Sequence, residues 1–84
     1  MSKVIRTFRK GAYVRYIGND PKHRELLTGI YQVHEKTHHM IVGCFPYKEV
    51  NGRKYFDTYA MPLSDFEIVI STQNGWETVK KESE

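Results

Sequence analysis

The stretch VHEKTHHM, residues 33–40, decides the fold, because it is compatible with two different backbones. His34-Glu35-Lys36-Thr37-His38 matches the H-E-x-x-H pattern, which binds zinc when an α-helix places both histidines on one face. The flanking segments GIYQV and MIVGCF are typical of β-strands, however, and the pattern contains neither Ala nor Leu, which favour helices. The segment therefore predicts a hairpin centred on Lys36-Thr37.

In that hairpin His34 and His39 are cross-strand neighbours, with Cβ atoms about 5 Å apart. His38 then points to the opposite face or out of the turn. A catalytic zinc needs three protein ligands, and the only other imidazole belongs to His23. A third ligand is possible, though not indicated, from Glu35 or Glu49. We therefore expect no metal, and interpret the segment as an exposed polar tip that gains positive charge below about pH 6.5.

One strand is predicted before this hairpin, and a second is predicted to form its first arm. Residues 11–18 (GAYVRYIG) and residues 29–35 (GIYQVHE) both alternate between two faces, as a half-buried strand does. The side chains that share one face are Ala12, Val14 and Tyr16 in the first segment, and Tyr31 and Val33 in the second. The connection, residues 19–28, contains turn-forming residues around Pro21 and predicts a loop with one helical turn at residues 24–27.

Two more strands are predicted from the hairpin onward. Residues 39–45 (HMIVGCF) form an almost continuous apolar run that Pro46 ends, and Cys44 is expected to be a small core residue. Asn51-Gly52 follows, and this dipeptide between apolar segments is the strongest short-range hairpin signal. The strand after it, residues 54–60, is expected to turn Phe56, Thr58 and Ala60 to one face and Tyr55, Asp57 and Tyr59 to the other.

The C-terminal part predicts the last elements. Residues 62–66 (PLSDF) favour a short 3₁₀ turn, because proline pre-sets φ and Ser64 and Asp65 can bond the local backbone. Residues 66–70 (FEIVI) are a final core strand. A second Asn-Gly pair, Asn74-Gly75, indicates a sixth strand that folds back. The end of the chain, KKESE, is expected to be disordered.

This order of elements resembles a small SH3-like barrel. Among such barrels, KOW-type domains open with a pattern of glycines and valines that Gly11, Val14, Gly18, Gly29 and Val33 could match. The loop at residues 19–28 is longer than the usual KOW loop and lacks its second glycine. Uncharacterised phage and prophage proteins with small barrels are also similar. The resemblance covers residues 11–70 and implies an all-β, five- to six-stranded SH3-like barrel with a 3₁₀ turn before the last core strand.

Length and charge fit one domain with two charged ends. The 84 residues are enough for one compact core, and a single cysteine with no signal-peptide pattern indicates a soluble cytoplasmic protein. Residues 1–24 hold seven Lys and Arg side chains against Asp20 alone, whereas residues 64–84 hold five carboxylates against two lysines. We expect a basic N-terminal arm at residues 1–10, the barrel at residues 11–70, and a C-terminal strand or flexible acidic tail at residues 71–84.

The aromatic side chains point to a binding surface. Eleven Phe, Tyr and Trp residues exceed what so small a core buries comfortably. If Val14, Val33, Phe56, Ala60 and Phe66 point inward, then Tyr13, Tyr55 and Tyr59 point outward among arginines and lysines. Such a surface suits nucleic acid, because bases stack on aromatic rings and cations hold phosphates. It also suits a protein partner, or the tyrosines simply cap hydrophobic edges.

We therefore predict a non-enzymatic binding module, with nucleic acid as the first partner and an unidentified protein as the alternative. No activated nucleophile, paired carboxylates or phosphate loop is present, and Asp57 is interpreted as a solvent-facing strand residue. No cofactor, metal, membrane or small-molecule substrate is expected. The predicted nucleic-acid-binding residues are Arg9, Lys10, Tyr13, Arg15, Lys22, Arg24, Arg53, Lys54 and Tyr55.

Overall fold

The structure is a computed structural model that describes residues 8–79. Residues 1–7, most of the predicted basic arm, and residues 80–84, the end of the predicted acidic tail, lie outside the described residues. The elements, in chain order, are β1 (Tyr13–Tyr16), α1 (Pro21–Leu26), β2 (Ile30–Lys36), β3 (Met40–Val50), β4 (Arg53–Pro62), η1 (Leu63–Asp65), β5 (Phe66–Thr72) and β6 (Gly75–Thr78).

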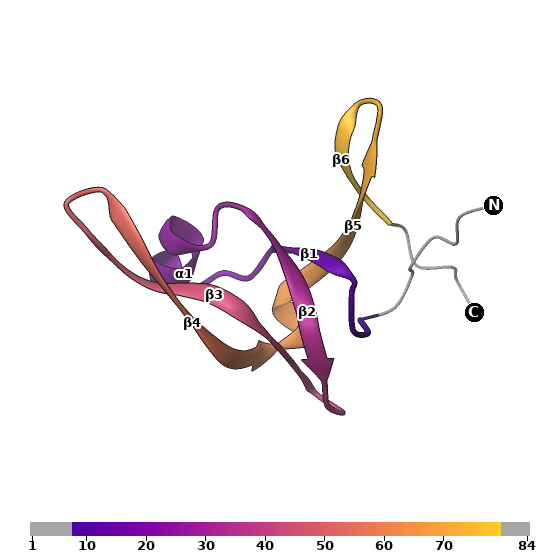
Figure 1. Cartoon of the computed structure of the whole chain (residues 1–84), viewed down its shortest axis with the longest axis horizontal. Coiled ribbons are helices and arrows are strands. Elements are labelled where there is room, and N and C mark those ends of the chain that lie inside the picture. Colours follow the sequence, from indigo (N-terminus) through magenta and orange to yellow (C-terminus); the bar gives the residue numbers. More distant parts are fainter. Residues whose placement is uncertain (1–7, 80–84) are drawn as a thin grey trace.

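The six strands form one antiparallel sheet in the order β4-β3-β2-β1-β5-β6 (Figure 1). The predicted all-β class is confirmed, as are the 3₁₀ turn η1 before β5 and the sixth strand. Strands β4 and β6 stand at the two ends of the order and do not pair with each other. The sheet is therefore not closed within residues 8–79, and a closed barrel is not confirmed.

The sheet curls around a core on one of its faces. Strands β3 and β5 are separated in the sheet by β2 and β1, yet the ring centroids of Phe45 and Phe66 are 5.4 Å apart. A flat sheet would keep these rings more than two strand spacings apart. In Figure 1 the strands accordingly cross in view instead of lying in one plane. The buried side chains of this core are Ala12, Val14, Tyr16, Leu26, Leu27, Val33, Ile41, Phe45, Met61 and Phe66.

The helix α1 covers one end of the core. Asp20 is its N-cap, and the carboxylate accepts hydrogen bonds from the backbone N–H groups of Lys22 and His23. Pro21 occupies the first helical turn, where its missing N–H costs nothing. The helix therefore begins three residues before the single turn predicted at residues 24–27. Leu26, in its last turn, is buried in the core.

The segment VHEKTHHM reverses direction, as predicted, but the turn lies two residues later. Lys36 pairs with Ile41, and the backbone N–H of Thr37 donates to the carbonyl of Met40 at 2.9 Å. The turn therefore centres on His38-His39 and not on Lys36-Thr37. The register also shifts between Val33 and Glu35. Consequently the prediction that His34 and His39 are cross-strand neighbours is wrong.

The hairpin of β3 and β4 is long and extends beyond the core. Its turn has positive φ at both central residues, 52° for Asn51 and 79° for Gly52, as the predicted type I′ turn requires. Strand β3 does not end at Pro46 but continues to Val50, because the register shifts between Pro46 and Lys48. A bulge of this kind is where a sheet tolerates proline.

The predicted orientation of β4 and the predicted burial of Cys44 in β3 are wrong. In β4, Tyr59 and Met61 face the core, whereas Phe56 and Ala60 are exposed, with Phe56 52% accessible. The reason is the register: Met61 pairs with Ile41, so both lie on the concave face. Cys44, predicted to be a core residue, is exposed for the same reason, since it alternates with the buried Phe45.

The hairpin of β5 and β6 extends from the opposite edge of the sheet. Ser71 pairs with Trp76 and Thr72 with Gly75, so the turn lies one residue before the predicted Asn74-Gly75 pair. Trp76 packs on the outer face of β1, where its ring centroid is 5.3 Å from that of Tyr13. This face of the sheet lies opposite the core.

Candidate functional site

The structure divides the nine predicted binding residues among three places. Tyr13 and Arg15 lie on β1, and Arg9 and Lys10 lie in the turn that precedes it. Lys22 and Arg24 lie on α1. Arg53, Lys54 and Tyr55 begin β4. The predicted residues therefore do not all share one surface. The three places also differ in whether their lysine and arginine side chains already have a bonding partner.

The group on β1 is partly neutralised. The guanidinium of Arg15 forms an ion pair with Glu67, 2.6 Å from Nη2 to Oε2, and Nη2 also donates to the hydroxyl of Thr78 at 3.0 Å. Tyr13 remains 42% exposed, but its ring packs against Trp76. Because Arg15 already pairs with Glu67, it is less able to bind a phosphate. The main feature of this face is the aromatic pair of Tyr13 and Trp76.

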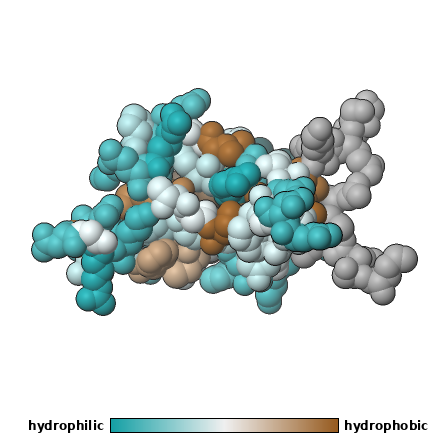
Figure 2. Space-filling model, turned by 90° about the horizontal axis from the view of Figure 1, so that it is seen from above, coloured by the Kyte–Doolittle hydropathy of each residue, from teal (hydrophilic) through white to brown (hydrophobic). Residues whose placement is uncertain are grey.

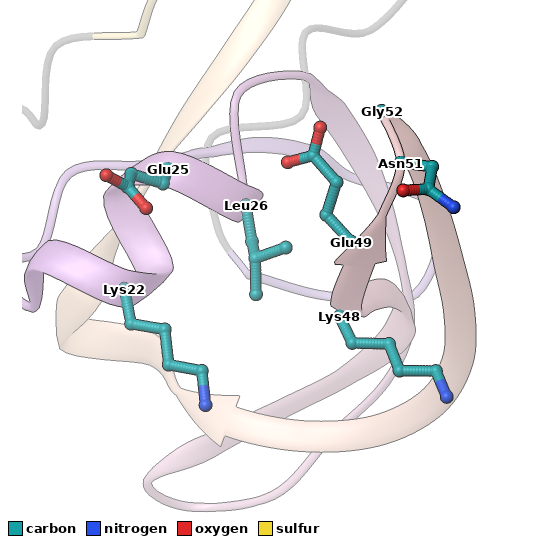
Figure 3. Close-up of a pocket in the computed structure, with 7 residues that line it drawn as sticks. All are labelled: Lys22, Glu25, Leu26, Lys48, Glu49, Asn51 and Gly52. Atoms are coloured by element: carbon teal, nitrogen blue, oxygen red, sulfur yellow. The ribbon is translucent and has the colours of Figure 1, made fainter.

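Helix α1 faces the β3–β4 hairpin across a cleft, and of the predicted residues only Lys22 lines it. A cavity of about 450 Å³ separates the helix from the tip of the β3–β4 hairpin. Its lining, shown in Figure 3, consists of Lys22, Glu25, Leu26, Lys48, Glu49, Asn51 and Gly52. A smaller cavity of about 220 Å³ shares Lys22 and Leu26 with it and includes Tyr47 and Tyr59. We refer to the two together as the helix–hairpin cleft.

Two tyrosines and two cations gather on the hairpin beside this cleft. The ammonium nitrogen of Lys48 lies 5.2 Å from the ring centroid of Tyr55 and 5.7 Å from that of Tyr47. The guanidinium carbon of Arg53 is 5.7 Å from the centroid of Tyr55. Tyr47 is 46% and Tyr55 37% exposed. We call Tyr47, Lys48, Arg53 and Tyr55 the tyrosine–lysine cluster; its rings are accessible and its cations are held next to them.

One hydrogen bond ties the hairpin to the segment that follows the helix. The ammonium group of Lys54 donates to the hydroxyl of Thr28 at 2.7 Å. Lys54 is also the cross-strand neighbour of Glu49. Lys54 therefore holds one wall of the helix–hairpin cleft in position, a structural role that the sequence prediction did not include.

Burial changes the acidity of one cleft tyrosine. The hydroxyl of Tyr59 donates to the carbonyl of Pro46 at 2.7 Å. Desolvation raises the pKa of Tyr59 above its ordinary value near 10, and the neighbouring Tyr31 raises it further. Tyr59 is thus a neutral, fixed part of the cleft wall and not an exposed platform, as its predicted outward orientation implied.

Sequence analysis did not identify Tyr47 and Lys48. The reason is that Pro46 was expected to end the strand, which left these residues in a loop. The register set by Asn51-Gly52 contained the missing information: counting back from the turn pairs Lys48 with Tyr55 and Val50 with Arg53. Applying the turn geometry to both arms would have placed the aromatic and basic side chains on one face.

The histidines of the H-E-x-x-H segment lie in a strand and a turn. The rings of His38 and His39 contact each other with centroids 4.4 Å apart, and His23 lies on α1 beside Tyr16. Without a helix through residues 34–38, the zinc-binding geometry of that pattern is not formed. Within residues 8–79 no group of three or more His, Cys, Asp or Glu side chains is placed to hold a metal ion.

The surface around the hairpin is hydrophilic. In Figure 2 hydrophilic side chains project from the end of the molecule that carries the β3–β4 hairpin, at the left, and brown hydrophobic patches lie nearer the middle. Across the part of the chain that the structure describes, no helix is long and apolar enough to span a membrane.

Three comparisons with known proteins leave the geometry as the guide to function. The chain matches no protein-family model, no curated protein and no solved structure.

Proposed function

We propose that the protein is a non-enzymatic, SH3-like binding module that binds single-stranded nucleic acid at the helix–hairpin cleft. The strand order supports the SH3-like class, because a four-strand meander is followed by a 3₁₀ turn and a fifth strand that returns to β1. The fold supplies the scaffold, and the cleft residues supply the binding.

The tyrosine–lysine cluster carries this proposal. Exposed tyrosine rings are stacking platforms for unpaired bases, each worth about 1–3 kcal/mol. Lys48 and Arg53 lie 5.2 and 5.7 Å from the Tyr55 ring, so a phosphate next to a stacked base meets a cation. Lys22 provides a further cation from the opposite wall of the cleft. A double helix hides its base faces, so this arrangement favours a single strand.

Binding of this kind is electrostatic and tolerant of sequence. Each phosphate that a lysine or arginine neutralises releases counterions, so affinity falls steeply as salt rises from about 50 to 200 mM. Glu25 and Glu49 reduce the positive charge of the cleft, and we therefore expect modest affinity. No covalent step is part of the proposal.

The experiment is a fluorescence-anisotropy titration of labelled single- and double-stranded DNA and RNA at two salt concentrations. The double variant Tyr47→Ala, Tyr55→Ala should weaken single-strand binding by about tenfold or more. Tyr13→Ala is the matched control, because Tyr13 is equally exposed but packs on Trp76 away from the cleft. Affinity that does not change with salt, or equal losses in both variants, would remove the proposal.

A second candidate function rests on the outer face of β3 and β4. Phe56, Ala60 and Cys44 are exposed there. Thr58 lies between Phe56 and Ala60 on β4, and Cys44 is its cross-strand neighbour on β3. An exposed apolar strip on a small domain is typical of a protein-binding surface. This alternative predicts a protein partner whose capture is insensitive to nuclease and is lost in Phe56→Asp.

A further inference from the structure

Each wall of the larger cavity carries one lysine and one glutamate, Lys22 and Glu25 on the helix and Lys48 and Glu49 on the hairpin. In Figure 3 the ammonium groups of Lys22 and Lys48 lie in the lower part of the view and the carboxylate of Glu49 lies in the upper part, whereas the carboxylate of Glu25 points outward from the helix. Within residues 8–79 the ion pair found is that of Arg15 with Glu67, so neither cavity lysine is paired with a cavity carboxylate. The cavity thus keeps cations and anions available at the same time.

From this arrangement we infer that the cavity selects a guanine nucleotide within a single strand. This inference rests on the proposed nucleic-acid binding and adds base preference to it. A nucleotide is anionic at its phosphate, and its guanine base presents two adjacent hydrogen-bond donors, N1–H and the N2 amino group. Lys22 and Lys48 match the first feature, and the two oxygens of a carboxylate match the second.

The other lining residues fit the same ligand. Leu26 adds a small apolar area to the lining, since only 6% of it is exposed. Asn51 lines the cavity from the tip of the hairpin, and rotation of its side chain would let the amide N–H donate to guanine O6. The volume of about 450 Å³ is within the range of cavities that bind small organic groups.

The remaining bases satisfy the carboxylates less well. Adenine and cytosine each present one amino group beside an acceptor nitrogen, so a carboxylate gains one favourable hydrogen bond and meets one repulsive lone pair. Thymine and uracil present a single imino donor between two carbonyl oxygens. We therefore expect guanine to bind best and thymine or uracil worst, with discrimination of about tenfold for one bidentate contact.

The test compares a labelled thymine oligonucleotide with the same oligonucleotide carrying two non-adjacent guanines, in lithium buffer to prevent quadruplexes. The guanine oligonucleotide should bind about tenfold more tightly. Hypoxanthine in place of guanine removes only the N2 amino group and should give an intermediate affinity. The backbone amide signals of Asn51 and Gly52 should shift when the guanine oligonucleotide is added.

The double variant Glu25→Gln, Glu49→Gln should abolish the preference and bind the thymine oligonucleotide at least as well as the wild type, because two negative charges are removed. Glu35→Gln is the control, since Glu35 is exposed on β2 and lines neither cavity of the cleft. Equal binding of both oligonucleotides by the wild type would overturn the base preference and leave the proposed function standing. A preference that survives the double variant would also overturn it. Absence of binding to either oligonucleotide would remove the proposed function itself.

Discussion

The rings of Phe45 and Phe66 are in contact across the concave face of the sheet, although two strands separate β3 from β5 in the hydrogen-bonded order. This contact joins the two halves of the molecule, since β3 continues into the β3–β4 hairpin and β5 into the β5–β6 hairpin. The helix–hairpin cleft is continuous with this core, because Leu26 belongs to both and Tyr59 of the cleft wall packs against Phe45.

Replacing Phe45 by Ala should destabilise the protein by ~3–5 kcal/mol, because a fully buried ring leaves a cavity. Urea unfolding followed by circular dichroism measures the loss. Phe56→Ala makes the same chemical change on a side chain that is 52% exposed, and it should cost less than about 1 kcal/mol. Equal losses would mean that Phe56, as the sequence had suggested, is the inward residue.

Replacing Lys48 by Ala should reduce the slope of log affinity against log salt by about 1, since one phosphate contact is lost. The measurement is a salt series of single-strand titrations. Lys36→Ala removes the same charge from the end of β2, away from the cleft, and should leave the slope unchanged. A slope that is the same in wild type and Lys48→Ala would mean that Lys48 does not contact a phosphate.

Replacing Gly43 by Ala should destabilise the protein by about 1–3 kcal/mol, because the new Cβ would lie 2.8 Å from the carbonyl oxygen of Gln32 and 3.0 Å from the Phe45 ring. Thermal unfolding gives the comparison. Gly29→Ala is the control, because its Cβ would make only ordinary contacts with Tyr31, the nearest atom being 3.5 Å away. If both variants unfold at the wild-type temperature, β2 and β3 are not packed as closely as described.

The thiol of Cys44 should react with a disulfide reagent in the folded protein, since the side chain is exposed on the outer face of β3. One equivalent should be titrated without denaturant, and addition of urea should not raise the number of reactive thiols. Reaction only after unfolding would restore the interpretation of Cys44 as a core residue.

Stability should fall as the pH rises above about 10. Desolvation raises the pKa of both Tyr31 and Tyr59 above that ordinary value, so the unfolded chain loses these protons at a lower pH than the folded chain. The contribution of these two tyrosines to the free energy of unfolding is complete below pH 10 and is lost as the pH rises through their raised pKa values. Melting temperatures across this range measure it.

The control for this alkaline effect is Tyr59→Phe. It should show a shallower fall in melting temperature, because one of the two shifted groups is absent. At neutral pH it should lose only about 1 kcal/mol, for the hydrogen bond from the Tyr59 hydroxyl to the Pro46 carbonyl. An unchanged fall would assign the alkaline sensitivity to other groups.

Local signals in the sequence were sufficient for the existence of the strands and hairpins, although two of the three hairpin turns lie one or two residues from their predicted positions. Asn51-Gly52 fixed a type I′ turn because both residues needed positive φ, and the apolar flanks of VHEKTHHM excluded a helix. These local signals did not determine which side chains of a strand point into the core. The run HMIVGCF is apolar at almost every position, so its alternation does not say whether Cys44 or Phe45 is inside; the register with β4 decides that.

The candidate site was predictable only in part. Lys22, Arg53, Lys54 and Tyr55 were identified from their charge and aromatic character, and all four lie at or beside the cleft. Arg15 was chosen by the same criteria, but its partner Glu67 is fifty-two residues away and only the fold brings them together. Charge in a sequence does not show which cations are already paired.

The unpaired edge of strand β4 bears on the tendency of the protein to aggregate. Among residues 8–79 this strand pairs with β3 alone, so its other side is a ready template for a further strand. Arg53, Lys54, Asp57 and Pro62 are the residues along it that discourage such growth. Exchanging them together for uncharged β-formers would be expected to make the protein prone to edge-to-edge association and fibril formation.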